Sequence, residues 1–342
     1  MKSDNKSINW INAIKAFSII AVFFAHAQRY YGCSFKMMNA YINPWYVNSF
    51  FFVSGYLLFW KQLSEPKILE DRKSYVKMGS GKTLFFNILF RIIIPSILFS
   101  FIEFVPSCLI QGRSIGIGYM LLKTVGGGTY WFTSALVVAE LILLLLLLTR
   151  KRNVWFYATI CFLLGIASLA IVKWSLLKTG VWAWRQGLIA LVFLAMGGLY
   201  WKYESRIDKL MRWWFVLLLL AVYVLVILCC KNTSSIVSTL KIQPLGFLTS
   251  AIACLLLVWL CKKLPEVKPL TFIGQNSLGF YFLSGALPIT FSLLAHRIMA
   301  GNQAWLVPAI WMACLAVAYV AVLIINRWLP WVFDLRLLTR KE

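Results

Sequence analysis

One stretch of the chain, residues 9–28 (NWINAIKAFSIIAVFFAHAQ), is long and apolar enough to cross a bilayer yet carries two ionisable side chains. Lys15 and His26 are eleven positions apart. On an α-helix this spacing brings them to within about 20° of each other and separates them by about 16 Å along the axis. Asn12, Ser18 and Val22 fall on or near the same face, so this one helix would offer a mostly polar track through most of the membrane. Ionisable groups inside a membrane helix are costly, so this polar face is a functional-site hypothesis.

An alternative interpretation needs no chemistry. Lys15 would extend its amine to the inner membrane surface, and His26 would only hydrogen-bond a neighbouring helix. The sequence of this helix by itself leaves both interpretations open.

The remainder of the chain is similarly apolar. Of its 342 residues, 61% are hydrophobic and only 13% are charged, which is typical of a multi-pass membrane protein. Segment length and hydropathy predict an all-α integral membrane protein with about ten transmembrane helices. These helices are expected near residues 9–28, 43–60, 84–110, 130–148, 154–172, 181–200, 212–230, 242–261, 270–294 and 303–326.

The distribution of basic residues predicts the orientation. With the amino terminus inside, 22 of the 34 lysines and arginines fall in inner segments and nine in outer segments. This bias places both termini in the cytoplasm. It also explains the net charge of +23 without a nucleic acid partner. The eight cysteines form no CxxC or Cys/His cluster, so neither a disulfide framework nor a metal site is expected.

Two cations are expected in the inner third of the membrane, Lys15 on the first helix and Arg91 on the third. The acidic residues within the predicted helices are Glu103 and Glu140. Glu103 follows Arg91 by twelve residues, about 120° around the helix and much farther out, so it is a poor partner for Arg91. A phosphate-bearing ligand entering from the cytoplasm would satisfy both cations. The alternative is that they reach the inner surface or bind lipid head groups.

His26 is expected in the outer half of the membrane. The chain has one other histidine, His296, in a short outer loop. Histidine suits general acid–base catalysis near neutral pH and can also accept an acyl group covalently. Neither a Ser/His/Asp order nor a metal-ligand spacing is apparent.

Three further segments carry polar or aromatic candidates with simpler explanations. Ser54 precedes Gly55, and this pair lets another helix backbone approach closely. Trp131 stands where an outer aromatic belt is normal. Arg185 could bind a sugar or lipid phosphate, or act as an interfacial anchor.

These motifs together resemble a known family. Lys15, ten intervening residues and His26 are similar to the basic-x10-His signature of acyltransferase family 3, which includes the fucose 4-O-acetylase-like enzymes. Four more segments resemble that family in the same order along nearly the whole chain: FFVSGYLL at 51–58, FRIIIP at 90–95, WFTSAL at 131–136 and FIGQNSLGFYFL at 272–283.

The resemblance implies a single transmembrane acyltransferase domain over residues 1–342 in a bacterial inner membrane. Members usually transfer acetyl from cytoplasmic acetyl-CoA, a donor substrate and not a bound cofactor, to a hydroxyl of a surface or lipid-linked glycan. By position, Lys15 and Arg91 would hold the donor and His26 would be catalytic. Acceptor or pocket residues would come from Asn12, Ser54, Trp131, Glu140, Arg185, Ser277 and Tyr281.

The chain departs from the family pattern at three positions. Asn12 stands where many members have aspartate, and Ile88 stands where the first arginine of an RxxR motif would fall. Ser284 stands where many members have a second histidine, so a two-histidine mechanism is not expected.

Two other classes of protein were weighed. A transporter or flippase also uses buried ionisable residues, but inverted repeats with matching broken helices would be expected, and none is apparent. A structural or signalling membrane protein would account for the composition but not for the pairing of Lys15 with His26.

Overall fold

The computed structural model describes residues 6–63, 81–110, 112, 116–149, 153–174, 181–229, 237, 245–299 and 303–338. Within these residues the protein is helical and has no strand. The α-helices are α1 (Lys6–Tyr31), α2 (Lys36–Ile42), α3 (Asn48–Leu63), α5 (Gly81–Ile88), α6 (Ile94–Ile110), α7 (Ile117–Lys123), α8 (Trp131–Leu147), α9 (Val154–Trp174), α10 (Trp184–Leu210), α11 (Trp213–Cys229), α13 (Gly246–Lys263), α14 (Lys268–Gln275), α15 (Ser277–Ile298) and α16 (Leu306–Trp328). Shorter helical pieces are the π-helix η1 (Leu89–Ile93) and the 3-10 helices η2 (Val181–Ala183), η3 (Pro330–Val332) and η4 (Leu335–Leu338).

Six helical segments in the described chain are long and apolar enough to cross a membrane. This confirms the prediction of an all-α membrane protein, while the number ten and the orientation stay predictions. The six segments are Asn9–Tyr31, Thr83–Pro106, Val181–Leu210, Gly246–Lys263, Ser277–Ile298 and Leu306–Trp328. Shorter apolar helices cover Trp131–Leu147, Val154–Leu169 and Trp213–Cys229.

Two of the predicted helices are interrupted. The segment predicted at 84–110 contains the π-helix η1, a local widening of the helix that often occurs at functional sites. The segment predicted at 270–294 divides at Asn276, whose side-chain amide donates to the Phe272 carbonyl and ends α14. Local hydrogen bonding of an asparagine competes with the helix there, which hydropathy does not detect.

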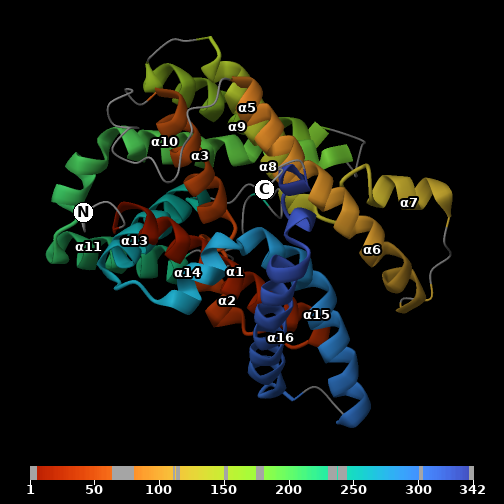
Figure 1. The fold of residues 1–342 in the computed structure, drawn as a ribbon. Helices are drawn as coiled ribbons and strands as arrows, with labels where there is room; N and C mark the ends of the chain where they lie inside the picture. The colour runs from red at the N-terminus through yellow and green to blue at the C-terminus, as the bar shows by residue number, and fades with distance from the viewer. Residues whose placement is uncertain are drawn as a thin grey trace.

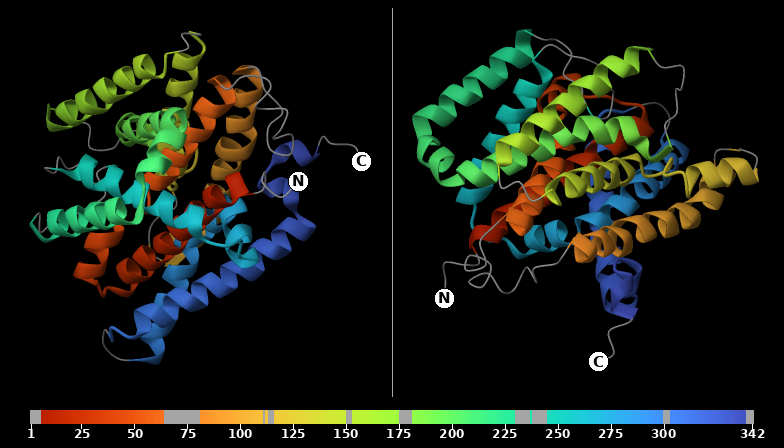
Figure 2. Two further views of the ribbon diagram at one scale, coloured as in Figure 1. Left: turned by 90° about the vertical axis from the view of Figure 1, so that its left-hand side faces the viewer. Right: turned by 90° about the horizontal axis from the view of Figure 1, so that it is seen from above.

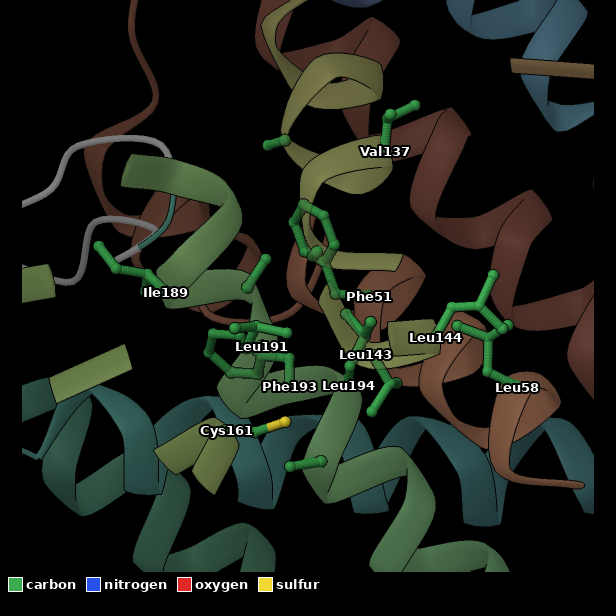
Figure 3. Packing of buried hydrophobic residues seen from close by; sticks show 14 of the residues in the cluster. Phe51, Leu58, Val137, Leu143, Leu144, Cys161, Ile189, Leu191, Phe193 and Leu194 are labelled. Atoms are coloured by element: carbon green, nitrogen blue, oxygen red, sulfur yellow. The ribbon is translucent and has the colours of Figure 1, made fainter. Parts of the chain in front are cut away.

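Most contacts between the described helices (Figure 1; Figure 2) fall in two groups, one around α1 and one around α10, and α3 contacts both of these helices. In one group, α1 packs against α14, α15, α13 and α16. In the other, α10 packs against α3, α9 and α8. Figure 3 shows the buried core of the second group, where Phe51 and Leu58 of α3 meet Leu143 of α8 and Leu194 of α10.

Glycines set the distance between α3 and α10. A Cβ on Gly55 would overlap the backbone of Leu194, and one on Gly197 would overlap the carbonyl of Phe52. Each helix thus places a glycine against the backbone of the other, and such small residues let membrane helices pack closely. This close approach was predicted for Ser54-Gly55.

Replacing Gly197 with valine should strongly reduce the amount of folded protein. The new side chain cannot fit against the Phe52 carbonyl without separating α3 from α10, and overpacking of this kind costs about 1–3 kcal/mol or more. Size-exclusion profiles of detergent-solubilised protein measure the folded fraction. Gly118→Val is the matched control, because a Cβ at Gly118 meets no atom within 4 Å. Equal profiles for the two variants would contradict the tight α3–α10 contact.

Candidate active site

A cavity of about 1010 Å³ opens beside the C-terminal half of α1. Residues from α1, α3, α6, α7, α8, α10 and α15 line it, so it lies between the two helix groups. Its lining is aromatic and polar: His26, Arg29, Glu103, Lys123, Tyr130, Trp131, Gln186 and Tyr281 contribute, among others. Such a surface suits a ligand with both hydroxyl groups and apolar ring faces.

His26 is fixed in this cavity by a hydrogen bond across 258 residues of sequence. Its Nδ1 lies 2.5 Å from the backbone carbonyl oxygen of Ser284 on α15. A carbonyl can only accept, so Nδ1 carries the proton and donates it. In the neutral imidazole, Nε2 is then the nitrogen with the free lone pair. His26 is therefore held in the tautomer that can take a proton or attack a carbonyl carbon.

The sequence of α15 explains why this carbonyl is available. In an α-helix the Ser284 carbonyl would accept from the N–H four residues later, but that residue is Pro288, which has no N–H. Pro288 is buried inside α15. The imidazole of His26 thus takes the place of a missing helix hydrogen bond.

A second group of charged residues surrounds Lys15. Arg91, Lys61 and Glu140 all act electrostatically on the Lys15 amine, and Arg336 acts on Lys61. The structure therefore brings together four cations from α1, α3, η1 and η4. The expectation that Lys15 and Arg91 share one region is met, and Lys61 and Arg336 join them.

Asp334 neutralises part of this cluster. Its carboxylate pairs with Arg336 at 2.5 Å and with Arg91 at 3.5 Å, and Arg336 also contacts the Asn87 side chain. Burial by itself would raise the pKa of Asp334, but the hydrogen bond and charge of Arg336, with the charge of Arg91, outweigh it and lower that pKa. Asp334 is therefore ionised at neutral pH.

Comparison with known proteins decides the family. The family model described as an acyltransferase domain, that of acyltransferase family 3, matches residues 8–327. The chain belongs to this family. No curated protein and no solved structure matches the chain. The protein is thus a membrane O-acyltransferase, as the five sequence motifs indicated.

The remaining predicted site residues of this acyltransferase fall into two sets. Trp131 and Tyr281 line the cavity with His26. The others lie outside the cavity lining. Ser54 donates to the Glu140 carboxylate near the cation cluster. Ser277 begins α15 outside the cavity lining.

Asn12 and Arg185 also lie outside the cavity lining. Asn12 is buried where its backbone carbonyl meets Gly274, so it helps α14 pack on α1. The guanidinium of Arg185 lies 5.3 Å from the ring centroid of Trp184, and its neighbour Gln186 lines the cavity instead.

The predicted polar face of α1 is not continuous in the structure. Ser18 is fully buried, and its hydroxyl lies 2.6 Å from that of Ser49 on α3. Sequence spacing places Ser18 near the face of Lys15 and His26, but helix packing covers it. The cavity lining includes His26 but not Lys15, so the cavity and the cation cluster lie at different heights along α1.

Sequence reasoning missed Lys61, Arg336, Tyr130 and Gln186, and treated Glu103 only as a poor partner for Arg91. Glu103 gave a usable signal, since an acidic residue in an apolar helix is rare. Lys61 and Arg336 lie at or beyond the ends of the predicted helices, where basic residues are common, so nothing in the sequence distinguished them.

Pro288→Ala should lower kcat of acyl transfer while leaving the KM for the donor nearly unchanged. The alanine N–H would donate to the Ser284 carbonyl within α15 and would compete with His26 Nδ1 for that acceptor. One neutral hydrogen bond is worth about 0.5–1.5 kcal/mol, which corresponds to about a 2- to 12-fold lower rate. Folding should not suffer, because removing a proline from a helix interior favours the helix.

Pro106→Ala is the control for this change. Pro106 also lies inside a helix, α6, but its side chain is exposed and does not line the cavity. A Pro288→Ala enzyme with unchanged kcat would show that the Ser284 carbonyl does not orient His26.

Proposed function

We propose that this acyltransferase moves acetyl from acetyl-CoA on the cytoplasmic side to a hydroxyl of a surface or lipid-linked glycan. The acceptor would enter the cavity beside His26, in a bacterial inner membrane. The observation that carries the proposal is the hydrogen bond from His26 Nδ1 to the Ser284 carbonyl. It leaves Nε2 as the reactive nitrogen of a histidine that lines a polar, aromatic cavity.

The cation cluster supports the donor assignment. Lys15, Lys61, Arg91 and Arg336 would bind the phosphates of acetyl-CoA, since guanidinium and ammonium groups form strong charge-assisted hydrogen bonds to phosphate. The donor phosphates would compete with Asp334 for Arg91 and Arg336. With the phosphates held there, the thioester would have to reach His26, about 16 Å farther along α1.

Both ways of transferring the acetyl use the lone pair of Nε2. As a base, Nε2 takes the proton of the acceptor hydroxyl; the oxygen bonds to the thioester carbon, the C–S bond breaks, and the proton passes to the leaving thiolate. As a nucleophile, Nε2 itself bonds to the acetyl carbon as the C–S bond breaks and the thiolate leaves. The acceptor oxygen then bonds to the acetyl carbon and displaces the histidine, and the proton of the acceptor hydroxyl passes to the thiolate.

Purified protein incubated with acetyl-labelled acetyl-CoA tests the proposal. We expect transfer of label to glycan isolated from the cells that make the protein, and free CoA in equal amount. Label that stays on the protein after removal of acetyl-CoA would indicate the acetyl-histidine route. Absence of both transfer and CoA release would reject acetyl-CoA as the donor.

A further inference from the structure

Glu103 is an acidic side chain that the proposed chemistry at His26 does not use. It lies on α6, whose neighbouring side chains Phe101 and Ile102 are 40% and 59% exposed and would face lipid. Glu103 is less exposed than these two and lines the cavity. A carboxyl group in an apolar membrane helix is costly, and its position toward the cavity indicates a ligand.

Tyr130 holds this carboxyl group in place. The Tyr130 hydroxyl donates to Glu103 Oε2 at 2.6 Å, and its ring packs edge-on against Phe282 with 5.1 Å between centroids. Tyr130 is only 6% exposed, so it is a rigid support. Among the described residues, no lysine or arginine forms an ion pair with Glu103.

The second carboxylate oxygen of Glu103, Oε1, faces the turn of α15 whose Ser284 carbonyl accepts the hydrogen bond from His26. A Cβ added at Gly285 would lie 3.2 Å from Oε1, and Gly285 directly follows Ser284, whose carbonyl accepts from His26. Glycine leaves room beside Oε1 that another residue would fill. Glu103 and His26 therefore approach the same turn from α6 and α1, with the cavity in common.

We propose that Glu103 binds a second hydroxyl of the acceptor while the reacting hydroxyl meets Nε2 of His26. This assignment rests on the proposed function. Since Tyr130 uses Oε2, Oε1 is the acceptor for a ligand hydroxyl, in a charge-assisted hydrogen bond. Because both groups line one cavity and approach one helix turn, the two hydroxyls belong to the same sugar residue. The acceptor class is a sugar with at least two free hydroxyls, one that is acetylated and one that Glu103 binds.

The test combines protein variants with sugars that lack single hydroxyls. Initial rates would be measured with acetyl-CoA and the methyl glycosides of glucose, galactose and mannose, each beside its monodeoxy forms. For the best wild-type acceptor, we expect that loss of one hydroxyl other than the acetylated one lowers kcat/KM about 10- to 150-fold, as for a charged hydrogen bond. In Glu103→Ala the deoxy sugar and its parent should react at equal rates.

The comparison of two sugars within one variant does not depend on how much protein is folded. Glu266→Ala is the matched control, because Glu266 is exposed and outside the cavity lining, and it should keep the wild-type ratio. A deoxy penalty that persists in Glu103→Ala would overturn the assignment of Glu103 and leave the proposed function intact. Wild-type protein that acetylates none of these glycosides nor isolated glycan would overturn the proposed function, and this assignment with it.

Discussion

His26→Ala should abolish acetyl transfer while leaving near-normal amounts of protein in the membrane. The substitution removes the Nε2 lone pair that both proposed routes require. It also removes the hydrogen bond to Ser284, yet one neutral hydrogen bond contributes only about 0.5–1.5 kcal/mol to stability. Transfer of labelled acetyl to isolated glycan measures activity, and quantitative immunoblots of membranes measure protein.

His26→Gln distinguishes chemistry from helix bridging. The glutamine amide can donate to the Ser284 carbonyl as Nδ1 does, but it cannot take a proton or carry an acyl group at neutral pH. If His26 catalyses the reaction, this variant should be as inactive as His26→Ala. If His26 only joins α1 to α15, glutamine should largely restore activity.

His296→Ala is the control for both substitutions. His296 is exposed and stacks on Tyr31 with 4.6 Å between ring centroids, outside the cavity lining. We expect most activity to remain. An active His26→Gln enzyme beside an inactive His296→Ala enzyme would reverse the assignment of the catalytic histidine.

Lys15→Gln and Arg91→Gln should each raise the KM for acetyl-CoA with a much smaller effect on kcat. A phosphate that loses one charge-assisted partner loses about 1.5–3 kcal/mol, which corresponds to about a 10- to 150-fold weaker interaction. The effect of Arg91→Gln should lie toward the lower end of this range, because the Arg91 side chain is 58% exposed and already pairs with Asp334. Both variants should fold, since removing one cation from the cluster relieves repulsion.

Steady-state kinetics with acetyl-CoA and with acetyl-dephospho-CoA, which lacks the 3′-phosphate, would show which phosphate each cation contacts. A variant that has lost its contact with the 3′-phosphate should use acetyl-CoA and acetyl-dephospho-CoA equally well. Lys36→Gln is the control, because Lys36 begins α2 and lies outside the cation cluster and the cavity lining. Unchanged KM values for both donors in both variants would reject the cluster as the donor site.

The sequence by itself determined the class of protein. Length and hydropathy are local properties, so they identified an all-α membrane protein, and the helical period placed Lys15 and His26 on one face of α1. The five ordered motifs were enough to identify acyltransferase family 3. Pro288 frees the Ser284 carbonyl wherever these residues are helical, a signal that sequence reasoning missed, and nothing near it in the sequence identifies His26 as the donor to that carbonyl.

Only the tertiary structure decided which faces of these helices meet. His26 hydrogen-bonds a carbonyl 258 residues away, Glu103 accepts from Tyr130, and Asp334, between η3 and η4, pairs with Arg91 of η1. Ser18, polar and on the expected face, is buried against Ser49. Helix formation depends on hydrogen bonds four residues apart, whereas these contacts depend on packing between helices distant in sequence. The sequence therefore predicts which residues form helices, whereas the contacts between helices are known only from the folded structure.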